Sequence, residues 1–120
     1  MILVVDDDPA FLERAREILN RTRQVFLTSS SRQALILAQD LGFSVVLVDL
    51  NLKREDGMGL IRRIREQFPA LPVIAIAEKV EEATAELVRG LGVADILQKP
   101  ITPEWKPVVE RVRALRARPS

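Results

Sequence analysis

Five short apolar runs, separated by segments with helical periodicity, limit the fold of this chain more than any other feature of its sequence. Each run has the length of a strand and is too short for a typical helix. The runs are residues 2–5, 25–28, 45–48, 73–77 and 94–97. Strands that alternate with helices form βαβ units, in which the strands are parallel. The pattern therefore predicts an α/β fold with a five-stranded parallel sheet.

The segments between the runs carry apolar residues at the spacing of amphipathic helices. We expect these helices from Pro9, over residues 31–41, after Gly57, over residues 80–91 and from Thr102 and Pro103 onwards. Asp8 is the expected N-cap of the first helix, and Gly42 and Gly92 are the expected C-terminal stops. Pro107 lies inside the last helix, so its first turn should be irregular. Strict alternation predicts a doubly wound, flavodoxin-like sheet of order 2-1-3-4-5 with helices on both faces.

The composition excludes several kinds of site. The chain has no Cys and no His, which removes the usual zinc ligands, a thiol nucleophile and any Ser-His or Cys-His arrangement. Its 18 Lys and Arg residues against 17 Asp and Glu residues indicate neither a nucleic-acid partner nor a membrane surface. Without a signal peptide or a transmembrane run of ~18 residues, we expect one cytoplasmic domain over residues 1–120, with residues 118–120 as a tail or the start of a linker.

Acidic residues follow two of the predicted strands, at the position where a ligand crevice is expected. In a sheet of this order the crevice opens between the carboxyl ends of the first and third strands. The first strand ends at Asp6 and Asp7, and the third reaches Asp49 at the same edge. Two carboxylates ~4 Å apart repel by about 4 kcal/mol at an effective dielectric of about 20, so a positive charge must hold them together. The pattern predicts a divalent cation with oxygen ligands, Mg²⁺ in particular.

A second positive charge follows the fifth strand. Lys99 ends the run ADILQK, and its amine can reach across the sheet edge as a point charge of the kind that binds phosphate. A metal and a lysine around one carboxylate describe a phosphoryl-transfer site with that carboxylate as the nucleophile. A single Asp at a strand end is more often a cap or a solvated turn residue. Four charged groups around one crevice are much harder to explain in that way.

Four motifs occur in a specific order and spacing. They are VVDDD at 4–8, VDLNLKREDG at 48–57, LPVIAIA at 71–77 and QKP at 98–100. Through these motifs the chain resembles, over essentially its whole length, the receiver (response-regulator) domain of two-component signalling. The resemblance also implies a cis peptide bond between Lys99 and Pro100.

The resemblance implies a role for each residue of the expected site. Asp49 would accept a phosphoryl group from a phosphohistidine on a histidine kinase or a histidine phosphotransfer protein. Asp6 and Asp7, with the backbone carbonyl of Asn51, would hold Mg²⁺, and Lys99 would contact the phosphoryl oxygens. The surface of the fourth helix, fifth strand and fifth helix would meet an output domain or a second copy of the chain. Such a module is a signalling domain, which at most assists its own phosphorylation and dephosphorylation.

Four residues depart from that family's pattern. Ala77 stands where Ser or Thr is usual and Ile96 where an aromatic residue is usual, so both halves of the usual switch are missing. Ala77 cannot donate the hydrogen bond to a charged group that is worth about 1.5–3 kcal/mol. Lys53 replaces a proline, and Glu78, which we expect to point to solvent, replaces a small residue. We therefore expect phosphorylation with a different or weakened coupling to the surface.

Two other functions stay open from the sequence. One is a degenerate receiver that binds its partner regardless of phosphorylation, because Ala77 and Ile96 lack the switch groups. The other is a Mg²⁺-dependent phosphatase, since Asp6 and Asp8 superficially resemble the acid pair of haloacid-dehalogenase-like enzymes. Asp8, however, is already explained as a helix cap. A flavin site is disfavoured because acids in the first loop would repel its phosphate.

Overall fold

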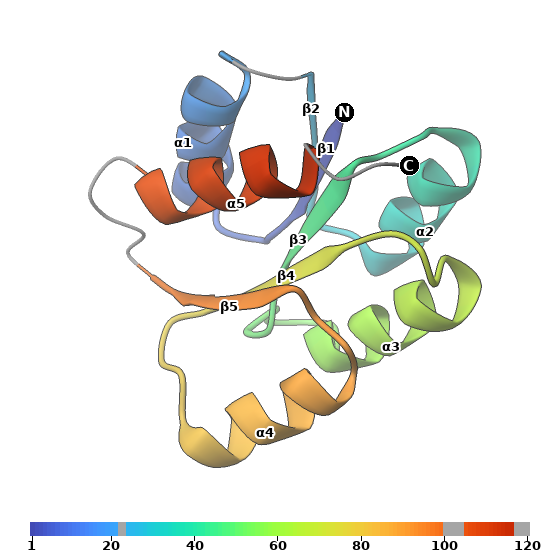
Figure 1. Ribbon diagram of the computed structural model, residues 1–120, viewed down its shortest axis with the longest axis vertical. Coiled ribbons are helices and arrows are strands. Elements are labelled where there is room, and N and C mark those ends of the chain that lie inside the picture. Colours follow the sequence, from blue (N-terminus) through green and yellow to red (C-terminus); the bar gives the residue numbers. More distant parts are fainter. Residues whose placement is uncertain (22–23, 100–104, 117–120) are drawn as a thin grey trace.

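Five parallel strands form one sheet between two layers of helices in the computed structural model, which describes residues 1–21, 24–99 and 105–116 (Figure 1). The elements are β1 (Ile2–Val5), α1 (Pro9–Leu19), β2 (Val25–Thr28), α2 (Ser31–Asp40), β3 (Val45–Asp49), α3 (Gly57–Gln67), β4 (Val73–Ala77), α4 (Glu82–Gly90), β5 (Asp95–Gln98) and α5 (Lys106–Arg116). The strand order is β2-β1-β3-β4-β5. This order confirms the predicted doubly wound sheet.

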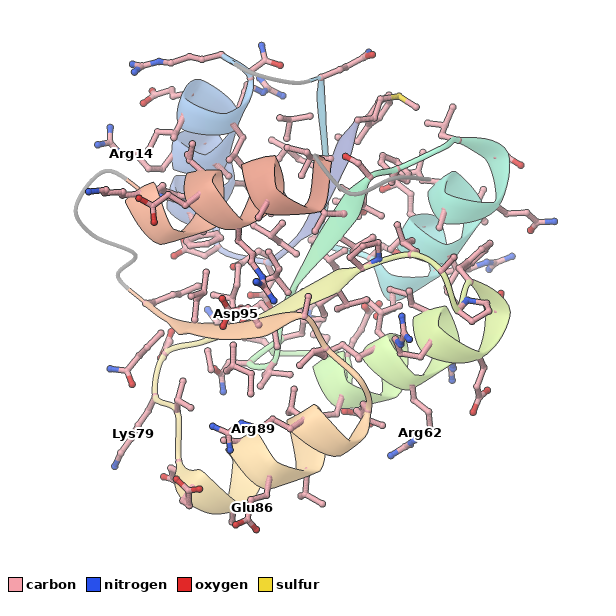
Figure 2. All side chains as sticks on the ribbon, in the orientation of Figure 1. Arg14, Arg62, Lys79, Glu86, Arg89 and Asp95 are labelled. Carbon is pink, nitrogen blue, oxygen red and sulfur yellow. The ribbon has the colours of Figure 1, made fainter. Side chains whose placement is uncertain are left out.

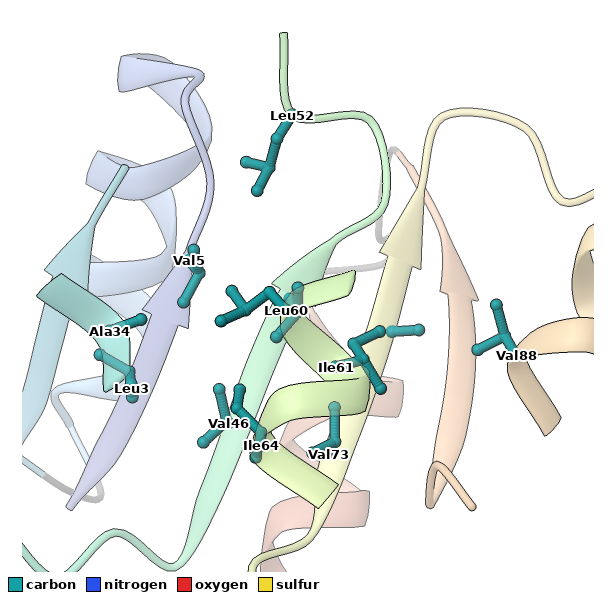
Figure 3. Close-up of a cluster of buried hydrophobic side chains, with 12 residues drawn as sticks. Leu3, Val5, Ala34, Val46, Leu52, Leu60, Ile61, Ile64, Val73 and Val88 are labelled. Atoms are coloured by element: carbon teal, nitrogen blue, oxygen red, sulfur yellow. The ribbon is translucent and has the colours of Figure 1, made fainter. Parts of the chain in front are cut away.

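The two faces of the sheet carry separate apolar cores, because successive strand residues point in opposite directions. Helices α1 and α5 cover one face, where Val4 and Leu47 pack with Leu19 of α1 and Val108 of α5 (Figure 1). Helices α2, α3 and α4 cover the other face. There Leu60, Ile61 and Ile64 of α3 lie against the sheet, with Ala34 of α2 and Val88 of α4 in the same cluster (Figure 3). Every residue of β1, β3 and β4 is buried, which explains their uninterrupted apolar sequences.

The strand register determines which residues meet at the carboxyl edge of the sheet. Val5 pairs with Val48, so the residues that follow them, Asp6 and Asp49, lie side by side at the carboxyl edge of the sheet. On the other side of β3, Asp49 pairs with Ile76 of β4. The backbone N–H of Lys99 donates to the carbonyl of Ala77 at 2.8 Å, which brings the residue after β5 to the same edge.

Most helix boundaries agree with the sequence prediction to within two residues. Asp8 caps α1 as expected, since its side chain accepts a hydrogen bond from the N–H of Ala10 at 3.0 Å. Gly92 ends the α4 segment with φ +81°, a conformation that suits glycine. Helix α2 ends at Asp40, two residues before the predicted stop. Its C-cap Leu41 is extended and Gly42 does not have a positive φ, so the expected left-handed glycine cap is not formed.

Helix α5 departs most from the prediction. It begins at Lys106, and Trp105 directly before it has φ +63°, so the helix does not run through Trp105 from residues 102–103. This start puts Pro107 in the first turn, where a missing N–H costs no helical hydrogen bond. The predicted beginning at Thr102 and Pro103, the Lys99–Pro100 bond and the tail at 118–120 lie outside the described residues.

Charged side chains occupy much of the outer surface of the helices. Arg62 of α3 and Glu86 of α4 extend away from the sheet into solvent (Figure 2), and the exposed Arg89 of α4 lies 3.8 Å from Glu82. Within the described ranges, every helix is too short or too polar to cross a lipid bilayer.

Candidate functional site

Three carboxylates converge at the carboxyl ends of β1 and β3. Asp6 and Asp7 directly follow β1, and Asp49 is the last residue of β3. One oxygen of each side chain lies within 4.8 Å of one oxygen of the others. Asp6 and Asp49 are only 0% and 3% exposed, whereas Asp7 is half-buried. The structure thus brings together the three acids that the strand-end pattern predicted to be neighbours.

The ammonium of Lys99 lies against two of these acids. Its Nζ is 2.7 Å from Oδ2 of Asp6 and 3.4 Å from Oδ2 of Asp49. The Lys99 side chain is 12% exposed, so the ion pairs are shielded from most of the solvent. The same Nζ lies 4.2 Å from the centroid of the Phe11 ring. One cation therefore neutralises part of a cluster of three negative charges.

Backbone amides orient the two buried carboxylates. Oδ1 of Asp6 accepts a hydrogen bond from the N–H of Asp8 at 2.8 Å, and Oδ1 of Asp49 accepts one from the N–H of Asn51 at 2.9 Å. In both residues this leaves Oδ2 toward Lys99. The carboxylates are held in place before any ligand arrives.

A backbone amide from a distant loop orients the third acid. The N–H of Lys53, in the loop between β3 and α3, donates to Oδ2 of Asp7 at 2.7 Å. Proline at position 53 could not donate this bond because it has no N–H. The sequence marked Lys53 only as a departure from a family pattern and did not indicate this contact, which depends on how the loop folds over β1.

Burial and charge shift the pKa values of the paired groups. Burial raises the pKa of Asp6 from 3.8 to about 6; the charge of Asp49 adds to this rise, while contacts with Lys99 and the N–H of Asp8 oppose it. Burial acts to lower the pKa of Lys99, but its contacts with Asp6 and Asp49 outweigh burial, and the pKa is raised. Burial, more than the neighbouring charge of Asp49, therefore disfavours ionisation of Asp6.

The chemistry of this donor set suits a hard divalent cation. Only carboxylate oxygens converge here, and such ligands fit Mg²⁺ or Ca²⁺. Oδ2 of Asp6 is buried, and the described residues offer it no partner besides the Lys99 ammonium at 2.7 Å. The side chain of Asn51 is engaged elsewhere, since its Oδ1 accepts the N–H of Glu78 at 3.0 Å. The predicted role of the Asn51 backbone carbonyl stays a prediction.

Gly57 packs directly on the backbone that carries Asp49. A Cβ at Gly57 would overlap the carbonyl oxygen of Asp49 and lie 2.9 Å from Cα of Leu50. Only glycine allows α3 to begin so close to the end of β3. Gly57 therefore has a structural role at the beginning of α3.

Three of the residues that depart from the family pattern lie in or directly after β4 and β5. Ala77 ends β4 and is 2% exposed, and Ile96 of β5 is half-buried. Glu78 is exposed, in agreement with the expectation that it points to solvent. The sheet edge near Asp49 therefore carries a methyl group at position 77, with no hydroxyl to bind an anion.

The contact of Phe11 with Lys99 was missed by the sequence interpretation. Helical periodicity in the sequence predicts only that Phe11 lies on the inner face of the first helix and Trp105 on that of the fifth. In the structure the two rings stack 4.7 Å apart between α1 and α5, and Phe11 also faces the Lys99 ammonium. Helical periodicity predicts that a side chain points inward but not which charged group it meets.

Comparisons with known proteins agree with this geometry. A protein-family model described as the response regulator receiver domain matches residues 2–106. The regulatory protein VirG of Rhizobium rhizogenes is 34% identical over 122 residues, which cover 99% of this chain and 49% of that protein. The chain spans about half the length of the curated relatives it matches.

Two solved structures share the fold over nearly the whole chain. The BeF3-activated DrrB receiver domain has a TM-score of 0.85 and 27% identity, covering 98% of this chain and 97% of that one. A response regulator protein from Burkholderia pseudomallei, solved with a phosphorylated aspartic acid, calcium ion and citrate, has a TM-score of 0.79 and 26% identity, covering 97% of this chain and 72% of that one.

Proposed function

The chain belongs to the response regulator receiver domain family, and from this we propose that its Asp49 accepts a phosphoryl group from a phosphohistidine of a partner protein. As a receiver domain of a two-component response regulator, it is a signalling module. One observation carries the proposal: Asp6, Asp7 and Asp49 present oxygens within 4.8 Å of one another, with Lys99 Nζ 3.4 Å from Asp49.

We assign Oδ2 of Asp49 as the nucleophile. Oδ1 accepts the N–H of Asn51, whereas Oδ2 faces the Lys99 ammonium. Attack of Oδ2 on phosphorus forms an acyl phosphate as the P–N bond of the donor breaks, and the released imidazole takes up a proton. The ammonium of Lys99 lies where the incoming phosphoryl oxygens need a counter-charge.

Asp6 and Asp7, with the backbone carbonyl of Asn51, would hold Mg²⁺ in this proposal. When bound, the ion neutralises charge on the transferring phosphoryl group. The backbone N–H groups of Asp8 and Lys53 fix the Asp6 and Asp7 carboxylates for that purpose. The calcium ion and phosphorylated aspartic acid named for the Burkholderia pseudomallei relative support this assignment by similarity.

The partners are part of the same proposal. The donor would be a histidine kinase or a histidine phosphotransfer protein in the cytoplasm. The surface of α4, β5 and α5 would meet an output domain or a second copy of the chain, with residues 1–120 acting as one receiver domain. The chain would assist its own phosphorylation and dephosphorylation without being a turnover enzyme.

Intact-mass spectrometry with Mg²⁺ and acetyl phosphate tests the proposal. We expect the mass of the wild-type chain to rise by one phosphoryl group and that of Asp49→Asn to stay unchanged. Lys99→Ala should slow the gain by roughly ten- to a hundredfold, the value of a hydrogen bond to a charged group. Lys79→Ala is the matched control, because Lys79 is exposed and pairs with Glu81 at the surface. A gain that persists in Asp49→Asn, or no gain in the wild type, would overturn the proposal.

A receiver that binds its partner regardless of phosphorylation is the second candidate. It is favoured by Ala77, whose methyl group cannot bind a phosphoryl oxygen, and by Ile96, which stands at the usual aromatic position. Absence of a mass gain with every donor, together with unchanged partner binding by Asp49→Asn, would support it.

The phosphatase alternative is weakened by the position of Asp8. Asp8 is exposed and its carboxylate caps α1, so it does not face Asp6 as a second catalytic acid would. Multiple-turnover phosphatase activity that survives Asp49→Ala would revive this alternative.

A further inference from the structure

An aromatic ring completes the surroundings of the Lys99 ammonium. Asp6 and Asp49 contact Nζ at 2.7 and 3.4 Å, and the Phe11 ring contributes its face with the centroid 4.2 Å from Nζ. A cation within ~6 Å of a ring centroid is attracted by the negative face of the ring, and more strongly where water is excluded. Since the Lys99 side chain is only 12% exposed, its contact with Phe11 belongs to the stronger, desolvated class of cation–π interactions.

The Phe11 ring also packs against a second aromatic side chain. Phe11 stacks on Trp105 with their centroids 4.7 Å apart and their planes at 36°. Trp105 is 4% exposed and has φ +63°, a conformation that a bulky residue adopts only when its surroundings hold it there. Phe11 is therefore fixed between the side chain of Lys99 and the beginning of α5.

We propose that Phe11 is a positioning residue, which holds the Lys99 ammonium in the acidic pocket while the acids bind other charges. This inference rests on the proposed function, because it concerns how Lys99 serves Asp49. Of the two carboxylates that contact Lys99, Asp6 would be shared with a divalent cation, which repels the ammonium, and Asp49 would carry the phosphoryl group. The Phe11 ring attracts the ammonium without competing for a carboxylate, so Lys99 can stay near Asp49.

The effect on phosphorylation should differ from that of a general structural defect. Phe11→Leu removes the aromatic face and should slow phosphorylation of Asp49 by acetyl phosphate about three- to thirtyfold, the range of a cation–π contact. The dissociation constant for Mg²⁺ should be unchanged or smaller, since a released ammonium repels the ion less. Phe11→Tyr keeps the ring face and should restore the rate. A rate like that of the wild type in Phe11→Leu, or slower transfer together with weaker Mg²⁺ binding, would overturn the inference.

The matched control is Phe43→Leu. Phe43 is also half-buried and also paired with an aromatic ring, Phe26, but it packs on the other face of the sheet. It should leave the phosphorylation rate unchanged, and an equal slowing in Phe43→Leu would contradict a specific role for Phe11.

An NMR measurement tests the position of Lys99 without phosphorylation. In the wild-type chain the Hε protons of Lys99 should be shifted upfield by the Phe11 ring and show nuclear Overhauser effects to it. The shift should persist in Phe11→Tyr and disappear in Phe11→Leu. Ordinary Hε shifts in the wild type would refute the inference even if Asp49 is phosphorylated. Shifted protons in a chain that no donor phosphorylates would instead refute only the proposed function.

Discussion

Replacing Asp6 with asparagine should stabilise the metal-free protein, although Asp6 is a proposed cation ligand. Asp6 is fully buried, and its pKa is raised to about 6, mainly by burial and additionally by the charge of Asp49. The carboxyl group is therefore harder to ionise in the folded chain than in the unfolded chain. Asparagine has nearly the same shape and carries no charge at either pH 4 or pH 8.

The magnitude follows from the size of the pKa shift. A rise from 3.8 to about 6 is about two units, and each unit corresponds to about 1.4 kcal/mol. Because the folded state binds the proton more tightly, the contribution of Asp6 to stability is complete below the unfolded pKa and is lost as the pH rises through about 6. Asp6→Asn should thus raise the free energy of unfolding by up to about 3 kcal/mol at pH 8 and by only about 0.6 kcal/mol at pH 4. Lys99 retains Asp49 as a counter-ion in this variant.

Urea denaturation in EDTA at both pH values measures this difference. The fluorescence of Trp105, the one tryptophan of the chain, reports unfolding from a buried position. Asp40→Asn is the control, since Asp40 is an exposed aspartate at the end of α2 and its substitution should change stability little at either pH.

Two results would refute the reasoning. A variant Asp6→Asn that is no more stable than the wild type at pH 8 would show that the ion pair with Lys99 outweighs the cost of burial. An equal gain at pH 4 and pH 8 would show that the effect comes from packing and not from ionisation.

Two further substitutions test the backbone contacts that hold Asp49 and Asp7 in place. Gly57→Ala should lower the free energy of unfolding by about 3 kcal/mol in thermal denaturation, because its Cβ would overlap the backbone of Asp49. Gly90→Ala, where a methyl group meets open space, should be neutral or stabilising, and equal losses in both variants would contradict the overlap. Lys53→Pro removes the N–H that holds Asp7 and should weaken Mg²⁺ binding at least about tenfold in calorimetry, whereas Lys53→Ala keeps it. Equal affinities in these two variants would exclude a role for the amide.

The sheet could be predicted from the sequence because its central strands are buried on both faces. The uninterrupted apolar runs of β1 and β4 agree with the predicted bounds to the residue, and alternation with helices predicted the strand order. The beginning of α5 could not be predicted in the same way. Periodicity carries no information on the left-handed backbone of Trp105 or on the contact of its ring with Phe11.

In the site, too, some contacts follow from the sequence pattern and others depend on how the chain packs. A rule of topology was enough to predict that Asp6, Asp49 and Lys99 lie at one edge, because parallel strands end together. The hydrogen bond from the backbone N–H of Lys53 to the Asp7 carboxylate depends on the path of the loop between β3 and α3. No periodic pattern in the sequence predicts that path.

A crystal structure with Mg²⁺ and beryllofluoride tests the central claim most directly. The account predicts beryllofluoride on a carboxylate oxygen of Asp49, in contact with Lys99, and Mg²⁺ bound by Asp6 and Asp7. Beryllofluoride on another residue, or an ion that leaves Asp6 and Asp7 uncoordinated, would contradict it.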